Sequence, residues 1–301
     1  ETSMSYEWPL LIFTLFAQLA VGIFLSVGIA RIAFHADGTS KTLTPLIVVT
    51  VPILAIGLCA SILHLGNPLG AMGAIGNISL SWLSREVLFG ALTLIGFAVT
   101  ALLCAKERKR AAGVSWLISG ILSIAFLISM GCAYQMPTIP AWNTPITVLS
   151  NFCSAFLMGF SALAAFLAIK NGNAHKNEGE FCLDKTDRDK TITLCAWILP
   201  CLFALDCFLQ TTLVSTLSQA GSAGVASIAL MTQAGSFLVA LRFVLGLIGV
   251  ALLSGVVGLM YSASISENLK KTLPAVSFLF IFAAMFLARM LFYSTAVNLQ
   301  F

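Results

Sequence analysis

Two ionisable residues flank a short stretch of the chain that carries no charge. His64 lies at the end of one apolar segment, and Glu86 follows Arg85 just inside the next. Residues 65–84 between them contain no charged residue, four glycines and one proline. Ionisable side chains at the ends of hydrophobic segments are costly in lipid, so we expect this pair to have a function. Histidine changes charge near neutral pH, and a nearby carboxylate can carry its proton onward.

The chemistry of this pair leaves three interpretations open. A quinol needs hydrogen-bond partners that accept protons from its ring hydroxyls, and apolar walls for its tail. His64 and Glu86 in an apolar pocket could meet that need. The same two residues could instead form a structural polar link between two membrane segments, or the proton-coupling site of a transporter.

The elements that must position these residues are membrane helices. The chain has 301 residues, of which 59% are hydrophobic and only 9% charged, and its mean hydropathy is +0.98. Long, nearly uncharged runs recur along the whole sequence, which is typical of an all-α polytopic membrane protein. We predict one integral membrane domain over residues 1–301 with eight transmembrane helices. The predicted spans are about 9–34, 44–64, 83–104, 114–134, 145–169, 191–217, 236–262 and 273–297.

The loops between these spans alternate in charge, which predicts their orientation. Lysines and arginines lie after spans one, three, five and seven, and the longest of these loops is the polar segment 170–190. The loops 65–82, 135–144 and 218–235, and both termini, contain neither residue. By the positive-inside rule the basic loops are cytoplasmic, so both termini are predicted to be periplasmic.

Orientation gives the remaining polar residues a depth. His64, Arg85 and Glu86 fall at the outer ends of their spans, and Arg242 and Arg289 fall in the outer halves of spans seven and eight. Trp142 belongs to a proline-rich outer loop at interfacial depth. The inner halves are almost purely apolar, whereas an ion channel would place polar groups through the full depth. The pattern predicts a pocket that opens near the outer face.

The residues available as ligands argue against a redox centre within this chain. Only one histidine lies inside an apolar span, whereas a membrane b-type haem usually needs two. The eight cysteines include no CxxC pair, and most lie in apolar spans, where cysteine acts as a small hydrophobe. We therefore expect neither a haem nor a metal site.

Short motifs along the whole chain resemble one family. The sequence is similar to the membrane anchor subunits of the dimethyl sulfoxide reductase family, which are quinol-oxidising anchors of molybdenum oxidoreductases. The most specific match is His64-Leu65-Gly66-Asn67-Pro68, followed about twenty residues later by the carboxylate of Glu86. The other matches occur in the family's order: Glu7-Trp8-Pro9-Leu10, Leu83-Ser84-Arg85-Glu86, Thr138-Ile139-Pro140-Ala141-Trp142, Leu241-Arg242, and Arg289 with Phe292-Tyr293.

The resemblance implies a role in anaerobic respiration in the bacterial inner membrane. Such a subunit anchors two periplasmic partners, a catalytic subunit with molybdopterin and an electron-transfer subunit with iron–sulfur clusters. It oxidises menaquinol near the periplasmic face. By the same resemblance His64 and Glu86 would bind and deprotonate the quinol, and Arg85, Trp142, Arg242 and Arg289 would line its site.

Two functions from other classes compete with this one. The first is a proton-coupled secondary transporter that uses His64 and Glu86, and the second is a structural anchor without a quinol site. Transporters typically bind their substrates at discontinuous helices near the middle of the membrane, and the sequence indicates none.

Overall fold

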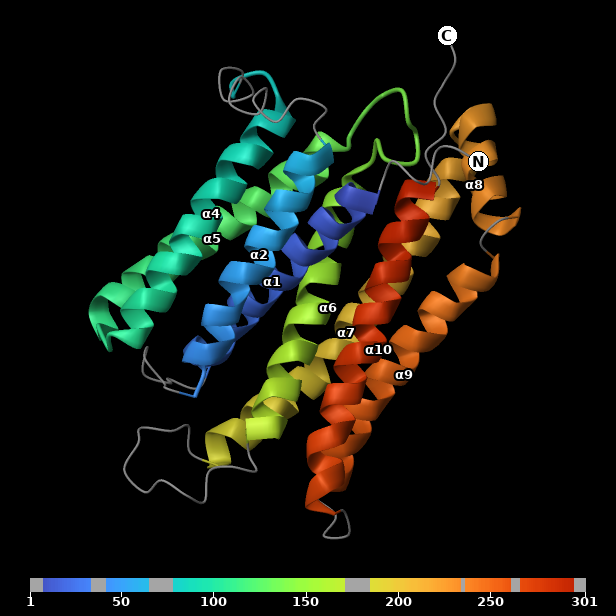
Figure 1. The fold of residues 1–301 in the computed structure, drawn as a ribbon. Helices are drawn as coiled ribbons and strands as arrows, with labels where there is room; N and C mark the ends of the chain where they lie inside the picture. The colour runs from blue at the N-terminus through green and yellow to red at the C-terminus, as the bar shows by residue number, and fades with distance from the viewer. Residues whose placement is uncertain are drawn as a thin grey trace.

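A computed structural model describes residues 8–33, 42–64, 78–170, 185–233, 236–260 and 266–294. Over these residues the protein is all-helical, with no strand (Figure 1). Its helices are α1 (Trp8–Ala33), α2 (Thr44–His64), α4 (Trp82–Ala105), α5 (Lys109–Ala133), α6 (Pro145–Lys170), α7 (Lys185–Ser218), α8 (Gly221–Gln233), α9 (Ser236–Met260) and α10 (Glu267–Ser294).

Eight of these helices are long and apolar enough to cross a membrane. Helices suit that environment because they satisfy every backbone hydrogen bond internally. The eight predicted spans are confirmed, while the periplasmic location of the termini stays a prediction. The segment 65–77, which includes the four glycines after His64, lies outside the described residues.

The helix α8 was not predicted. The uncharged segment 218–235 was expected to be an outer loop, but Gly221–Gln233 forms a helix of 13 residues. Gly221 adopts a φ of 73° between the end of α7 and the start of α8. That left-handed conformation is favourable for glycine, which allows the chain to turn sharply there. In Figure 1 α8 lies at the same end of the bundle as the end of α10.

The bundle is organised around α1 and α6. In each of these two helices 78% of the apolar stretch is buried inside the protein, against 28–33% in the other six spans. Their backbones touch at two glycines: a Cβ on Gly22 would lie 1.8 Å from the carbonyl oxygen of Ala155, and a Cβ on Gly159 would lie 2.1 Å from that of Gly22. Small residues at helix crossings allow this close approach in membrane proteins.

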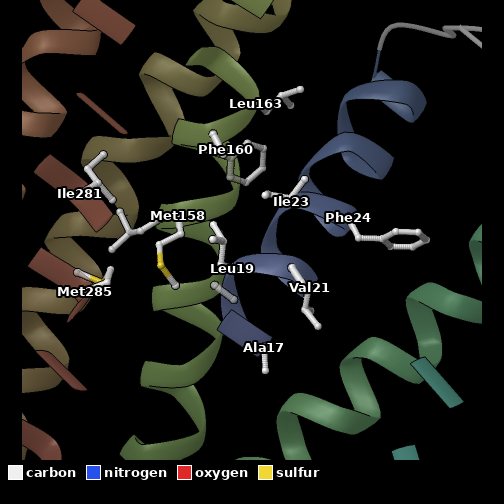
Figure 2. Close-up of a cluster of buried hydrophobic side chains, with 14 of the residues drawn as sticks. Ala17, Leu19, Val21, Ile23, Phe24, Met158, Phe160, Leu163, Ile281 and Met285 are labelled. Atoms are coloured by element: carbon white, nitrogen blue, oxygen red, sulfur yellow. The ribbon is translucent and has the colours of Figure 1, made fainter. Parts of the chain in front are cut away.

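Apolar side chains fill the space on both sides of this crossing. Leu19 and Ile23 of α1 lie toward Met158 and Phe160 of α6, and Phe24 points to the opposite side (Figure 2). There the Phe24 ring stacks on Phe97 of α4 and on Trp116 of α5, with centroids 4.1 and 4.5 Å apart. α1 therefore ties α4 and α5 to the half of the bundle formed by α6, α7, α9 and α10.

Candidate functional site

Glu86 is a buried carboxylate near the start of α4. The helix begins at Trp82, and the Ser81 hydroxyl caps it by accepting a hydrogen bond from the backbone N–H of Ser84 at 3.3 Å. Glu86 is only 5% exposed, and its Oε1 has no hydrogen-bond partner among the described residues. Buried carboxylate oxygens are normally paired, so this one is available to a ligand.

Arg85, the neighbour of Glu86, serves a different contact. Its Nε and Nη2 donate to the carbonyl oxygens of Ile78 and Ser79, both at 2.8 Å, and its guanidinium lies 4.2 Å from the centre of the Trp82 ring. These bonds hold the turn that leads into α4. Whether Arg85 also binds quinol stays a prediction.

His64 is the last residue of α2, and its side chain lies outside the described part of the protein. The helix backbones still indicate its depth. A Cβ on Gly90, one turn deeper than Glu86, would lie 3.0 Å from the Leu58 side chain of α2. At 1.5 Å per residue, Glu86 lies about 6 Å beyond this contact and His64 about 9 Å beyond it. The two predicted residues therefore end at similar depth on neighbouring helices.

An aromatic cluster adjoins Glu86. The hydroxyls of Tyr134 and Tyr293 are hydrogen-bonded at 2.7 Å, and the Tyr293 hydroxyl also donates to the carbonyl oxygen of Leu10 at 3.3 Å. Both phenols interact electrostatically with the Glu86 carboxylate. The hydroxyl pair thus extends from the surroundings of Glu86 to the first turn of α1. Sequence reasoning missed this pair, because the two tyrosines are 159 residues apart.

Trp142 belongs to the same cluster. Its indole N–H donates to the backbone carbonyl of Phe292 at 3.0 Å, its ring stacks on that of Phe292 with centroids 5.1 Å apart, and Tyr134 packs edge-on against it. The indole is buried at 7% exposure, so it joins loop 135–144 to the end of α10.

Arg289 lies deeper on α10, in a series of buried polar groups. Its Nη2 donates to Asn151 Oδ1 at 2.6 Å, and Gln18 Nε2 donates to the same oxygen at 3.1 Å. These hydrogen bonds join α10, α6 and α1. Asn151 and Gln18 were not among the predicted site residues, although amides inside apolar spans are a signal that sequence alone provides.

Arg242 lies on α9 and is ion-paired with Asp206 of α7. Both side chains are nearly inaccessible, at 4% and 1% exposure. Arg242 also lines two cavities, of about 310 and 40 Å³, which share Gln210 and Phe292 in their walls. Arg289 lines the smaller one. The larger cavity is mainly apolar, which is typical of sites for small organic ligands.

The predicted residues therefore fall into two groups. Glu86 lies beside the tyrosine pair, near the end of α2, while Arg242 and Arg289 lie at the cavities between α6, α7, α9 and α10. Phe292 connects the groups, because it lines both cavities and packs edge-on against Tyr134. Among the described residues no cluster of three histidine, cysteine or acidic side chains is arranged to hold a metal ion.

Comparison with known proteins identifies a single family. Residues 2–295 match the sequence profile of the family described as "DMSO reductase anchor subunit (DmsC)". The protein is 35% identical over 167 residues to the anaerobic dimethyl sulfoxide reductase chain YnfH of Escherichia coli, an alignment that covers 54% of this sequence and 58% of that relative.

Two further relatives share this description, and both are C subunits of anaerobic dimethyl sulfoxide reductases. The protein is 30% identical over 164 residues to the subunit of Haemophilus influenzae, covering 54% of this sequence and 59% of the relative. It is also 30% identical over 159 residues to the subunit of Escherichia coli, covering 51% and 55%. The matched region thus spans little more than half the length of each relative.

Proposed function

Because the chain belongs to the DMSO reductase anchor subunit family, we propose that it is the membrane subunit of a reductase complex and oxidises menaquinol near the periplasmic face of the bacterial inner membrane. The quinol loses two protons and two electrons and leaves as menaquinone. The electrons pass to an iron–sulfur subunit, and from there to a catalytic subunit with molybdopterin. The anchor itself carries no haem in this proposal.

The buried, unpartnered oxygen of Glu86 is the observation that carries the proposal. A quinol hydroxyl placed between α2 and α4 could donate a hydrogen bond to Glu86 or to His64. Either residue can then accept the proton as the ring is oxidised, because each titrates within reach of neutral conditions in a suitable environment. Apolar side chains such as Leu58 and Phe126, which meet at Gly90 just below, offer walls of the kind that the isoprenoid tail needs.

The tyrosine pair supplies a path for the released proton. From Glu86 the hydroxyls of Tyr134 and Tyr293 continue toward the Leu10 carbonyl, in the first turn of α1. In this proposal the protons therefore leave on the side where the quinol is oxidised. Arg242, Arg289 and Trp142 remain proposed contacts of the quinol, with the cavities beside Arg242 as the place for its tail or for its entry.

The transporter alternative gains no specific support. Each of the eight spans is a continuous helix over its described residues, whereas substrate sites of secondary transporters typically lie at broken helices.

Two substitutions test the proposal in the intact complex. His64→Ala and Glu86→Gln should each lower quinol-dependent turnover by about 10²–10⁴-fold, the usual effect of losing a group that transfers a proton. Activity with reduced viologen, which donates electrons directly to the partner subunits, should remain at the wild-type level. Subunit abundance in the membrane should also be unchanged.

The control removes a carboxylate charge elsewhere. Asp187→Asn, at the opposite end of the bundle, should leave both activities intact. If quinol and viologen activities fell together with subunit abundance, the pair would be a structural link between α2 and α4. Full quinol activity in both variants would exclude these residues from the reaction.

A further inference from the structure

A groove runs between α1 and α5 at the end of the bundle where α1 ends and α5 begins (Figure 1). Its volume is about 340 Å³, and its walls are mainly apolar. Three wall residues are strongly exposed, namely Ile32 at 80%, Leu117 at 67% and Ile121 at 59%. The groove therefore opens on the surface that faces the lipid. It lies at the opposite end of α1 from the tyrosine pair, so it is separate from the proposed quinol site.

One cation lies at the mouth of this groove. The Arg31 guanidinium lies 4.4 Å from the centre of the Trp116 ring. Its Nε is buried and has no hydrogen-bond partner in the described part of the protein, and no described carboxylate forms an ion pair with it. A guanidinium held at the edge of an apolar groove requires an anion, and its fork of N–H donors matches the oxygens of a phosphate.

The surroundings of Arg31 are basic as well. The turn before and at the start of α5 contains Lys106, Arg108, Lys109 and Arg110, all exposed, with Glu107 as its one acidic residue. Basic pockets between transmembrane helices are typical binding sites for the headgroups of anionic lipids. The charge of this end therefore favours an anionic ligand over a neutral one.

The floor of the groove is shaped for an acyl tail. Gly113 and Gly120 are two turns apart, on the same face of α5. A Cβ on Gly113 would meet nothing within 4 Å, and one on Gly120 would meet only the Leu25 side chain, at 3.8 Å. These glycines are therefore not required by helix packing, in contrast to Gly22 and Gly159. They leave an open channel about 10 Å long beside apolar side chains.

We propose that this groove binds one anionic glycerophospholipid. Its phosphate lies on Arg31, and one acyl chain follows the channel along Gly113 and Gly120. The lipid would fill the space between α1 and α5 and neutralise the arginine. This inference is independent of quinol oxidation.

Native mass spectrometry of the purified complex tests the proposal, with added phosphatidylglycerol or phosphatidylcholine as probes. One phosphatidylglycerol should bind to the wild type in preference to phosphatidylcholine. Arg31→Gln should weaken phosphatidylglycerol binding about tenfold or more, because a charge-assisted hydrogen bond is lost. Gly120→Leu fills the channel and should abolish binding. Gly113→Leu is a second filling variant, and retained thermal stability establishes that each variant is folded.

Two controls define the failure of the idea. Gly255→Leu adds the same bulk on α9, where a Cβ also meets nothing within 4 Å, and should leave lipid binding unchanged. Inorganic phosphate at millimolar concentration should not displace the lipid. Equal retention of phosphatidylglycerol in Arg31→Gln, Gly120→Leu and Gly255→Leu would overturn the proposal. Equal binding of phosphatidylcholine, or displacement by phosphate alone, would do the same.

Discussion

Glu86 and Asp206 are both buried carboxylates within the helical bundle, but their partners differ. Asp206 is paired with Arg242 across α7 and α9, whereas Glu86 Oε1 has no partner among the described residues. A paired charge fixes two helices relative to each other, and breaking such a pair is costly. An unpaired oxygen can accept a hydrogen bond or a proton from a ligand. The difference teaches that burial alone does not distinguish a structural carboxylate from one available for chemistry.

The largest expected effect concerns the paired carboxylate. Asp206→Ala leaves the Arg242 guanidinium buried without a counter-charge, and we expect it to destabilise the folded subunit by about 3–5 kcal/mol. The double variant Asp206→Leu/Arg242→Met replaces the pair with apolar groups and should recover most of that loss. Thermal unfolding of the purified complex in detergent measures both.

An exposed ion pair provides the matched control. Asp187 and Lys190 are 3.7 Å apart with side chains 39% and 58% exposed, so Asp187→Ala should cost less than about 1 kcal/mol. If the double variant were as unstable as Asp206→Ala, the loss would come from the shape of Asp206 and not from the unpaired arginine.

The sequence predicted the membrane spans well and the helix ends less well. Hydropathy placed the starts of spans four, six and eight at 114, 191 and 273, but the helices start at Lys109, Lys185 and Glu267. Hydropathy detects only the apolar part of a helix, and backbone hydrogen bonds continue through polar residues beyond it. α8 was missed because its 13 residues are too few for a span and follow a glycine.

The site was partly predictable for a similar reason. Ionisable residues inside apolar spans stand out in the sequence, so Glu86, Arg242 and Arg289 could be selected as buried polar groups. Their partners could not be derived, because pairing depends on how each helix is rotated about its axis. The Asp206–Arg242 pair and the Tyr134–Tyr293 pair both join separate helices, and only the packed bundle brings them together.

A smaller effect is expected from bulk at the cavity beside Arg242. Ala288 lines both cavities, and Ala288→Phe would occupy part of that space. If the quinol tail or ring uses the cavity, KM for quinol should rise about tenfold with kcat unchanged, since only binding is lost. Steady-state kinetics with a soluble quinol analogue measures this. Leu279→Phe, on an exposed part of α10, is the control and should change neither parameter.

This variant separates the two regions. A change in KM from Ala288→Phe, together with a change in kcat from Glu86→Gln, would assign binding to the cavity and proton transfer to the carboxylate. An unchanged KM would remove the cavity from the quinol site and leave the space beside Glu86.

The smallest expected effect concerns the two phenols beside Glu86. Tyr293→Phe leaves the Tyr134 hydroxyl without its partner, whereas Tyr134→Phe leaves the Tyr293 hydroxyl bonded to the Leu10 carbonyl and near Thr14 Oγ1. A lost hydrogen bond costs about 1 kcal/mol, and an orphaned buried hydroxyl costs more. We therefore expect Tyr293→Phe to lower the free energy of unfolding by about 1 kcal/mol more than Tyr134→Phe. The double variant should be no less stable than Tyr293→Phe, because it removes the orphaned group. Denaturation of the three variants in detergent measures the order. The reverse order would mean that Tyr134 has a second partner in this bundle, and the path from Glu86 through Tyr293 would lose its basis.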